Sequence, residues 1–219
     1  MKYRLAIFDL DGTVLNTLAD LSDAVNAALT ACEYPARTEE QVRDFIGDGI
    51  KKLIERAVPT DTAAEDVARV YAAFVAHYTA HCADKTAPYA GIVTMLRTLR
   101  AGGVKTAVLS NKAYPATVAL CNAYFEGLFD VVMGERESEG VPKKPAPDAV
   151  LAIMAQCGVT AADTVYIGDS DVDVKTAANA GISAISVTWG YRSVDLLLEN
   201  GANVLASTPQ KLQELILNA

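Results

Sequence analysis

The sequence has few cysteines and no long hydrophobic run, and both shortages limit what the protein can be. Its four cysteines, Cys32, Cys82, Cys121 and Cys157, are widely spaced and form no Cys-x-x-Cys pair. Secreted proteins held by disulfides are usually short and rich in cysteine, so we expect reduced thiols that are mostly packed in the interior. No apolar run approaches the roughly 18 to 20 residues that a membrane-spanning helix needs. The apolar segment at the N-terminus is also too short for a signal peptide, so we expect a cytoplasmic protein without a membrane partner.

An excess of basic residues is also absent. Lysine and arginine number 19 against 27 aspartates and glutamates, which gives a net charge of -8, and no basic stripe stands out. Such a balance argues against a nucleic-acid partner. It does not exclude an anionic small substrate, because a bound metal ion can reverse the local field. Neither the charge nor the composition indicates an oligomeric state.

Apolar runs alternate with helical segments along most of the chain. Five runs predict strands, at residues 3–13, 104–112, 129–134, 164–173 and 182–190. Helical periodicity appears between them, at residues 115–128, 146–158 and 173–181. This alternation predicts an α/β fold with a mostly parallel sheet, and the continuous apolar strands indicate that helices cover both of its faces.

The segment from residue 15 to residue 87 has a different pattern. Four stretches in it have helical periodicity, and none is a convincing strand. Pro88 and Gly91 mark a turn where the α/β pattern resumes. We therefore expect a helical cap domain at 15–87, inserted into a core domain made of residues 1–14 and 88–219.

Three of the predicted strand segments end in polar side chains. They are Asp9 and Asp11 in segment 3–13, Ser110, Asn111 and Lys112 in segment 104–112, and Asp169 and Asp173 in segment 164–173. In open parallel sheets ligands bind at the carboxyl ends of the strands, so we expect these residues to meet at one edge. Crowded carboxylates repel one another unless a cation lies among them, and oxygen ligands favour Mg²⁺.

Four segments resemble, in order, the four motifs of the haloacid dehalogenase (HAD) superfamily. They are DLDGT at 9–13, SNK at 110–112, KKPAPD at 143–148 and GDSDVD at 168–173. The resemblance covers essentially the whole chain, including the helical segment after the first motif. It implies a Rossmann-like, doubly wound α/β core with an inserted α-helical cap, and an Mg²⁺-dependent phosphatase that acts on a small phosphorylated metabolite.

The resemblance also implies a role for each acidic residue. Asp9 would attack phosphorus and form an aspartyl-phosphate, and Asp11, expected to point the same way from an extended backbone, would act as general acid and base. Mg²⁺ would be held by the Asp9 carboxylate, the Asp11 backbone carbonyl and Asp169. Asp173 would support the metal through water or a neighbouring ligand.

Two further motifs would bind the phosphoryl group. Ser110 and the Asn111 backbone would hold its oxygens, and Lys144 would neutralise charge between it and Asp9. Lys143 is the competing lysine, but the family pattern Lys-Pro-x-Pro fits Lys144, which directly precedes Pro145.

A glycine-containing loop in the helical segment is a candidate for contacting the rest of the substrate. Gly47 and Gly49 interrupt two helical stretches, and together with Arg56 they resemble the Gly-x-Gly…Arg-Ala cap stretch of phosphoglycolate phosphatases. Arg56 could meet a substrate carboxylate, or it could be an exposed helix arginine. The glycines could equally form a simple turn between helices.

Several reactions remain open within the superfamily. Asp11 argues against a dehalogenase, which needs no leaving-group acid, and against transport ATPases, which carry lysine there. A phosphomutase is compatible with the motifs. The cap favours 2-phosphoglycolate, while other small phosphomonoesters and pyrophosphate are alternatives. An aspartyl-phosphate switch is the alternative from another class, although receiver domains are smaller and lack a cap.

Overall fold

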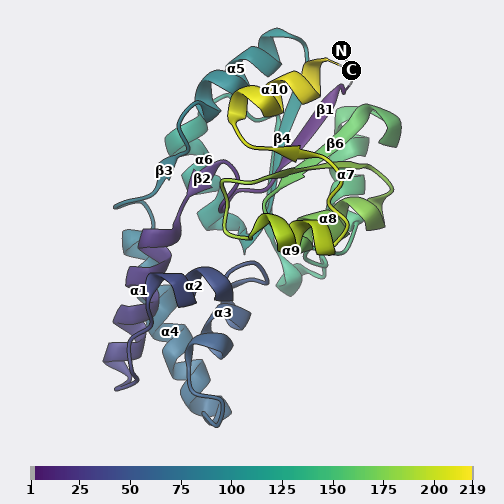
Figure 1. Ribbon diagram of the computed structural model, residues 1–219. Coiled ribbons are helices and arrows are strands. Elements are labelled where there is room, and N and C mark those ends of the chain that lie inside the picture. The colour runs from purple at the N-terminus through teal and green to yellow at the C-terminus, as the bar shows by residue number, and fades with distance from the viewer. Residues whose placement is uncertain (1–2, 219) are drawn as a thin grey trace. The chain divides into compact units, whose positions relative to one another are not determined.

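The computed structural model describes residues 3–218, and it divides into two compact units (Figure 1). One unit contains the chain up to Leu15 and again from Pro88, and the other is Asn16–Ala87. The boundary expected from the sequence differs from this division by one residue.

A six-stranded sheet of parallel strands forms the centre of the larger unit. In spatial order the strands are β5 (Val131–Glu135), β4 (Lys105–Ala113), β1 (Leu5–Phe8), β6 (Thr164–Gly168), β7 (Ser183–Val187) and β8 (Leu205–Ala206). The first five lie within or close to the five predicted runs. The order reverses beside β1, as in a doubly wound sheet, so the predicted α/β fold class is confirmed.

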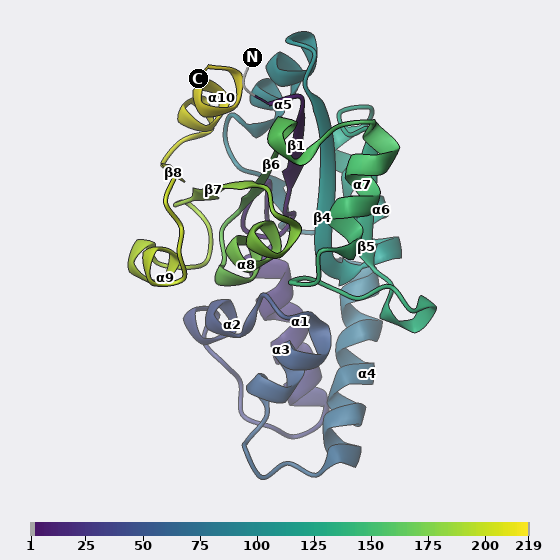
Figure 2. The same cartoon turned by 90° about the vertical axis from the view of Figure 1, so that its right-hand side faces the viewer.

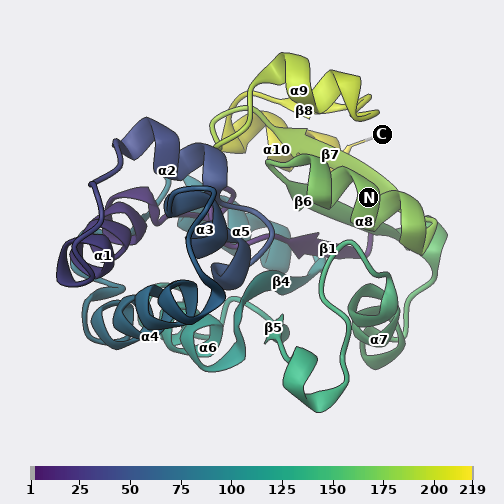
Figure 3. The ribbon, with the colours of Figure 1, turned by 90° about the horizontal axis from the view of Figure 1, so that it is seen from below.

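Helices cover both faces of this sheet. They are α5 (Ile92–Ala101), α6 (Tyr114–Phe125), α7 (Asp148–Cys157), α8 (Asp171–Ala180), α9 (Val194–Glu199) and α10 (Pro209–Leu217), with short 3-10 turns at Glu137–Glu139 and Ala161–Asp163. Helices α5 and α10 contact each other on one side, and α7 and α8 contact each other on the opposite side (Figure 3). Leu5 and Ile7 of β1 pack against α7, and all four residues of β1 are fully buried. Covering both faces explains why β1 is a continuous apolar run.

The strand register places the carboxyl ends of β1 and β6 beside the middle of β4. Phe8, the last residue of β1, lies opposite Val108 of β4 and Ile167 of β6. The Asp9 N–H then donates to the Ile167 carbonyl over 2.8 Å. Asp9 and Asp169, which follow β1 and β6, and Ser110–Lys112 in the last part of β4 are therefore brought to one edge, as the sequence predicts.

The smaller unit is built from helices. They are α1 (Leu18–Ala31), α2 (Glu39–Phe45), α3 (Ile50–Ala57) and α4 (Ala64–His81), and α1 and α4 run side by side (Figure 2). Their inward faces share a core that includes Leu29, Ile54 and Phe74. A capping box between Thr38 and Gln41 starts α2.

The two ends of the helical segment are joined by a buried carboxylate. Asp20 in the first turn of α1 accepts hydrogen bonds from the backbone N–H groups of Lys85 and Thr86, at distances of 2.8–3.0 Å. The strands β2 (Leu15–Asn16) and β3 (Ala87–Pro88) pair beside it as a two-stranded sheet. The sequence pattern indicated neither feature, because two-residue strands carry no periodicity.

All four cysteines are free thiols, and all but the half-buried Cys82 are buried, as expected. Over residues 3–218, no helix has the length and apolar character needed to cross a membrane.

Candidate active site

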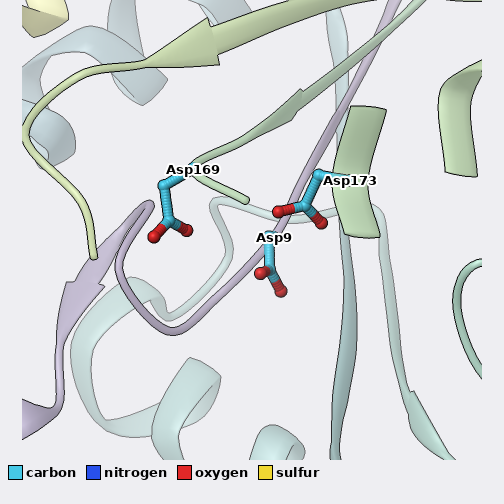
Figure 4. Close-up of side chains that lie close together, drawn as sticks. All are labelled: Asp9, Asp169 and Asp173. Atoms are coloured by element: carbon cyan, nitrogen blue, oxygen red, sulfur yellow. The ribbon is translucent and has the colours of Figure 1, made fainter. Parts of the chain in front are cut away.

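Three aspartates meet at the carboxyl edge of the sheet (Figure 4). Asp9 follows β1, Asp169 follows β6, and Asp173 lies in the first turn of α8. Each offers a carboxylate oxygen within 4.8 Å of those of the other two, and all three residues are buried. Within residues 3–218 this is the only such group of three or more potential metal ligands. The structure thus brings together the three predicted residues whose carboxylates would hold or support a metal.

Asp169 is fixed by two donors. Its Oδ1 accepts from the Thr13 hydroxyl over 2.9 Å, and its Oδ2 accepts from the Tyr191 backbone N–H over 2.7 Å. The backbone of Gly12 and Gly190 lies so close to this carboxylate that a Cβ at either position would collide with it. Gly12 also has φ +81°, so it serves the tight turn expected after Asp11.

Lys144 is the cation of the cluster. Its side chain is 2% exposed, and its Nζ lies 2.9 Å from Asp9 Oδ1 and 2.7 Å from Asp173 Oδ1. The other oxygen of Asp173 accepts from the Ser170 hydroxyl over 2.6 Å, within the capping box that starts α8. One oxygen of Asp173 is therefore bound to lysine and the other to a helix cap.

The Asn111 side chain positions Lys144 through two hydrogen bonds. No local sequence pattern indicates this contact. Asn111 Nδ2 donates to the Lys144 carbonyl over 3.1 Å, and Asn111 Oδ1 accepts from the Lys144 N–H over 2.9 Å. This pair of bonds joins β4 to the loop before α7. Lys143 instead extends to Glu137 at 3.2 Å, so Lys144 is the lysine of the site.

Asp11 lies apart from the carboxylate cluster and has its own lysine. Both of its carboxylate oxygens accept from Lys112 Nζ at 3.0 Å. The chain bends at Leu10, two residues after β1 ends at Phe8, and the Leu10 carbonyl accepts turn bonds from Thr13 and Val14. Asp9 and Asp11 therefore face different cations.

Burial, together with charge crowding, shifts the ionisation of the cluster. Burial raises the pKa of Asp169 from its ordinary value of 3.8 to about 7, and the Asp173 carboxylate adds to this rise. Burial raises the pKa of Asp9 well above its ordinary value, although Lys144 opposes the shift. One lysine thus does not offset three buried carboxylates. A dication would, and an all-oxygen donor set of this kind fits Mg²⁺.

Ser110 lies at the same edge, as predicted. It is buried, and its hydroxyl oxygen accepts from the Lys112 backbone N–H over 3.2 Å. Asp171, one residue after the cap of α8, pairs with Lys175 at 2.6 Å as an ordinary helix-start acid.

The predicted substrate loop lies in the helical unit, next to Arg56 of α3. Arg56 donates to the Phe45 carbonyl over 2.9 Å and pairs with Asp48 at 2.5 Å, so the arginine braces the loop that contains Gly47 and Gly49. Both glycines have positive φ, +129° and +87°, and Gly49 caps α3. The glycines therefore serve the loop conformation that interrupts the two helices.

Comparison with known proteins gives a consistent result. The model of the haloacid dehalogenase-like hydrolase family matches residues 6–187. A phosphoglycolate phosphatase of Mesorhizobium japonicum is 33% identical over 197 residues, which cover 87% of this chain and 85% of that protein. One of Chromobacterium violaceum is 32% identical over 96% of this chain and 95% of its own length. A crystal structure of a candidate phosphoglycolate phosphatase from Lactobacillus delbrueckii subsp. bulgaricus superposes with a TM-score of 0.96 at 38% identity, covering all of both chains.

Proposed function

The chain belongs to the haloacid dehalogenase-like hydrolase family, and we propose that it hydrolyses 2-phosphoglycolate with Mg²⁺ through an aspartyl-phosphate on Asp9. Its family and its phosphoglycolate phosphatase relatives make it a phosphoric monoester hydrolase.

The observation that carries the proposal is the buried cluster of Asp9, Asp169 and Asp173 around a single lysine. The Asp9 and Asp169 carboxylates and the Asp11 carbonyl would hold Mg²⁺. When bound, the ion neutralises these carboxylates and draws a phosphoryl group toward them. Lys144 keeps part of the cluster's charge balanced and orients Asp9.

In the first step, an oxygen of Asp9 attacks phosphorus and the bond to the leaving oxygen breaks. The Lys144 ammonium and the Leu10 N–H both bind Oδ1, at 2.9 and 2.7 Å, which leaves Oδ2 as the attacking atom. Protonated Asp11 gives its proton to the leaving glycolate oxygen, so the products of this step are glycolate and the phosphorylated Asp9.

In the second step, water attacks the phosphorus of the aspartyl-phosphate. Asp11, now a carboxylate, takes a proton from this water, and Asp9 leaves as a carboxylate while inorganic phosphate forms. The enzyme then carries a proton on Asp11 again, so both steps balance. The Ser110 hydroxyl and the N–H groups at the end of β4 would hold phosphoryl oxygens throughout.

The substrate is proposed from the relatives and from the loop at Gly47 and Gly49. Relatives that match over 85% or more of their own length are named phosphoglycolate phosphatase. Arg56 binds the Phe45 carbonyl and the Asp48 carboxylate and so holds the backbone of this loop in place. We propose that this loop recognises the carboxylate end of 2-phosphoglycolate.

Phosphate release from a panel of substrates tests the proposal. The panel contains 2-phosphoglycolate, other small phosphomonoesters, a hexose phosphate and pyrophosphate, each with Mg²⁺ and with chelator. Asp9→Asn should abolish turnover, while Asp171→Asn serves as the matched control because Asp171 pairs with Lys175 outside the cluster.

The outcomes separate the alternatives. A clear preference for 2-phosphoglycolate that needs both Mg²⁺ and Asp9 supports the proposal. Conversion of a hexose phosphate to its isomer without phosphate release would indicate a mutase. Stable labelling of Asp9 without turnover on any compound would contradict the hydrolase and indicate a switch.

A further inference from the structure

Lys112 is a buried cation that the two chemical steps above leave without a role. It is the last residue of the Ser110–Lys112 motif, and its side chain is 3% exposed. Its Nζ lies 3.0 Å from each carboxylate oxygen of Asp11, whose side chain is 13% exposed. The buried Lys112 ammonium is equidistant from both oxygens of the Asp11 carboxylate. It therefore constrains the orientation of that carboxylate.

Hydrogen bonds to neighbouring side chains hold the backbone of Lys112 in place. Lys112 lies in β4, its N–H donates to the Ser110 hydroxyl, and its carbonyl accepts from the Thr117 hydroxyl over 3.1 Å. The backbone of Gly134 in β5 also lies close to the Lys112 carbonyl. A Cβ at Gly134 would be 2.8 Å from the Lys112 carbonyl oxygen. Asp11 lies in the turn after β1, and Gly12 follows it with positive φ.

We propose that Lys112 is a positioning residue for Asp11: it holds both carboxylate oxygens so that Asp11 is aimed at the leaving oxygen in the first step and at water in the second. The inference rests on the proposed function, since it assigns a residue to the general acid and base of that reaction.

Two other roles would make different use of the same lysine. Lys112 could bind a phosphoryl oxygen directly, in which case it would act independently of Asp11. It could also serve stability alone, as a buried ion pair. Neither requires that its effect on turnover pass through Asp11, so a double-mutant cycle separates the three roles.

The cycle compares Lys112→Met, Asp11→Asn and the double variant. Lys112→Met should lower kcat for 2-phosphoglycolate by about 10- to 100-fold and change KM by less than about threefold, because part of the acid–base contribution is lost. In the Asp11→Asn background the same substitution should change kcat by less than about twofold. Lys143→Met removes a nearby lysine that pairs with Glu137, and it should leave kcat unchanged.

A burst experiment supplies a readout that loss of stability would not produce. The p-nitrophenolate group leaves with little protonation, so phosphorylation of Asp9 by p-nitrophenyl phosphate should keep its wild-type rate in Lys112→Met. Dephosphorylation still needs Asp11 as base, so the steady state should slow and the burst should become more prominent. Lys112→Gln, which retains a donor, should give an intermediate kcat and serves as the second variant if Lys112→Met does not fold.

Several results would overturn the assignment. If Lys112→Met costs as much in the Asp11→Asn background as in the wild type, or mainly raises KM, the lysine binds substrate instead. An unchanged kcat in both Lys112 variants leaves it a structural residue only. A wild-type enzyme that turns over no phosphomonoester would refute the proposed function itself, which is a separate result.

Discussion

The stability of the metal-free protein should fall as the pH rises from about 4 to about 7, because Asp169 is hard to ionise in the folded state. Burial and the Asp173 carboxylate raise its pKa from 3.8 to about 7. The folded protein therefore keeps a proton on Asp169 over a range in which the unfolded chain has lost it. The stabilisation is fully present below pH 4 and is lost as the pH rises through 7.

The size of this effect follows from the shift. One pKa unit corresponds to about 1.4 kcal/mol, so a shift of roughly three units corresponds to about 4 kcal/mol over the full range. Between pH 5 and 7.5, where unfolding is conveniently measured, the free energy of unfolding should fall by about 2.5 kcal/mol from this group. The raised pKa of Asp9 acts in the same direction.

Urea unfolding followed by circular dichroism, in chelator at several pH values, measures this slope. Asp169→Asn should flatten it, because the neutral amide has no proton to lose. Asp171→Asn, on a half-buried acid of the same segment that pairs with Lys175, should leave it unchanged. Mg²⁺ at about 100 times its dissociation constant should restore about 2.7 kcal/mol near pH 7.5 in the wild type, and little in Asp169→Asn.

Two results would refute the reasoning. One is an equal slope in the wild type and Asp169→Asn, which would mean that another group carries the pH dependence. The other is equal stabilisation of both proteins by Mg²⁺, which would mean that the ion binds away from the carboxylate cluster.

Three further substitutions test other parts of the structure. Lys144→Met leaves buried carboxylates unpaired and should cost about 3–5 kcal/mol of stability in chelator by urea unfolding, whereas Lys143→Met should cost under about 1 kcal/mol. Gly168→Ala places a Cβ against the Asp173 carboxylate and should cost about 1–3 kcal/mol and displace that carboxylate in a crystal structure. Arg56→Gln removes the hydrogen bond to the Phe45 carbonyl that holds the loop, and it should raise KM for 2-phosphoglycolate about tenfold more than KM for p-nitrophenyl phosphate. Lys52→Gln on the same helix is the control and should change neither KM. Equal effects of Arg56→Gln on both substrates would contradict a role of the loop in recognising the substrate.

Much of the fold could be predicted because its signals are local and long. The strands β1, β4 and β6 are apolar runs that end in polar residues, and α8 begins at a Ser-x-x-Asp capping pattern. The short strand β8 carries too few residues for a pattern. The Asp20 contact with Lys85 and Thr86 joins residues 65 and 66 positions apart, which no local pattern contains.

The same difference between local signals and long-range contacts decides which features of the site could be predicted. The residue types that meet at the sheet edge could be predicted, because parallel strands bring their carboxyl ends together. Which residues bind which could not. The bonds between Asn111 and the Lys144 backbone span 33 positions, and the Lys112–Asp11 pair spans 101. The hydrogen bond from the Thr13 hydroxyl to Asp169 could more easily have been predicted, because Thr13 is the last residue of the first motif.

The two aspartates of the first motif show why pairing matters more than residue type. Asp9 and Asp11 are chemically identical and two residues apart, yet the proposed reaction needs one to attack phosphorus and the other to move protons. Asp9 lies 9% exposed among other carboxylates and faces Lys144, in a place suited to a dication. Asp11 lies outside that cluster, with Lys112 on both of its oxygens. Two carboxylates in different surroundings can perform different chemistry, and here a separate lysine defines the surroundings of each.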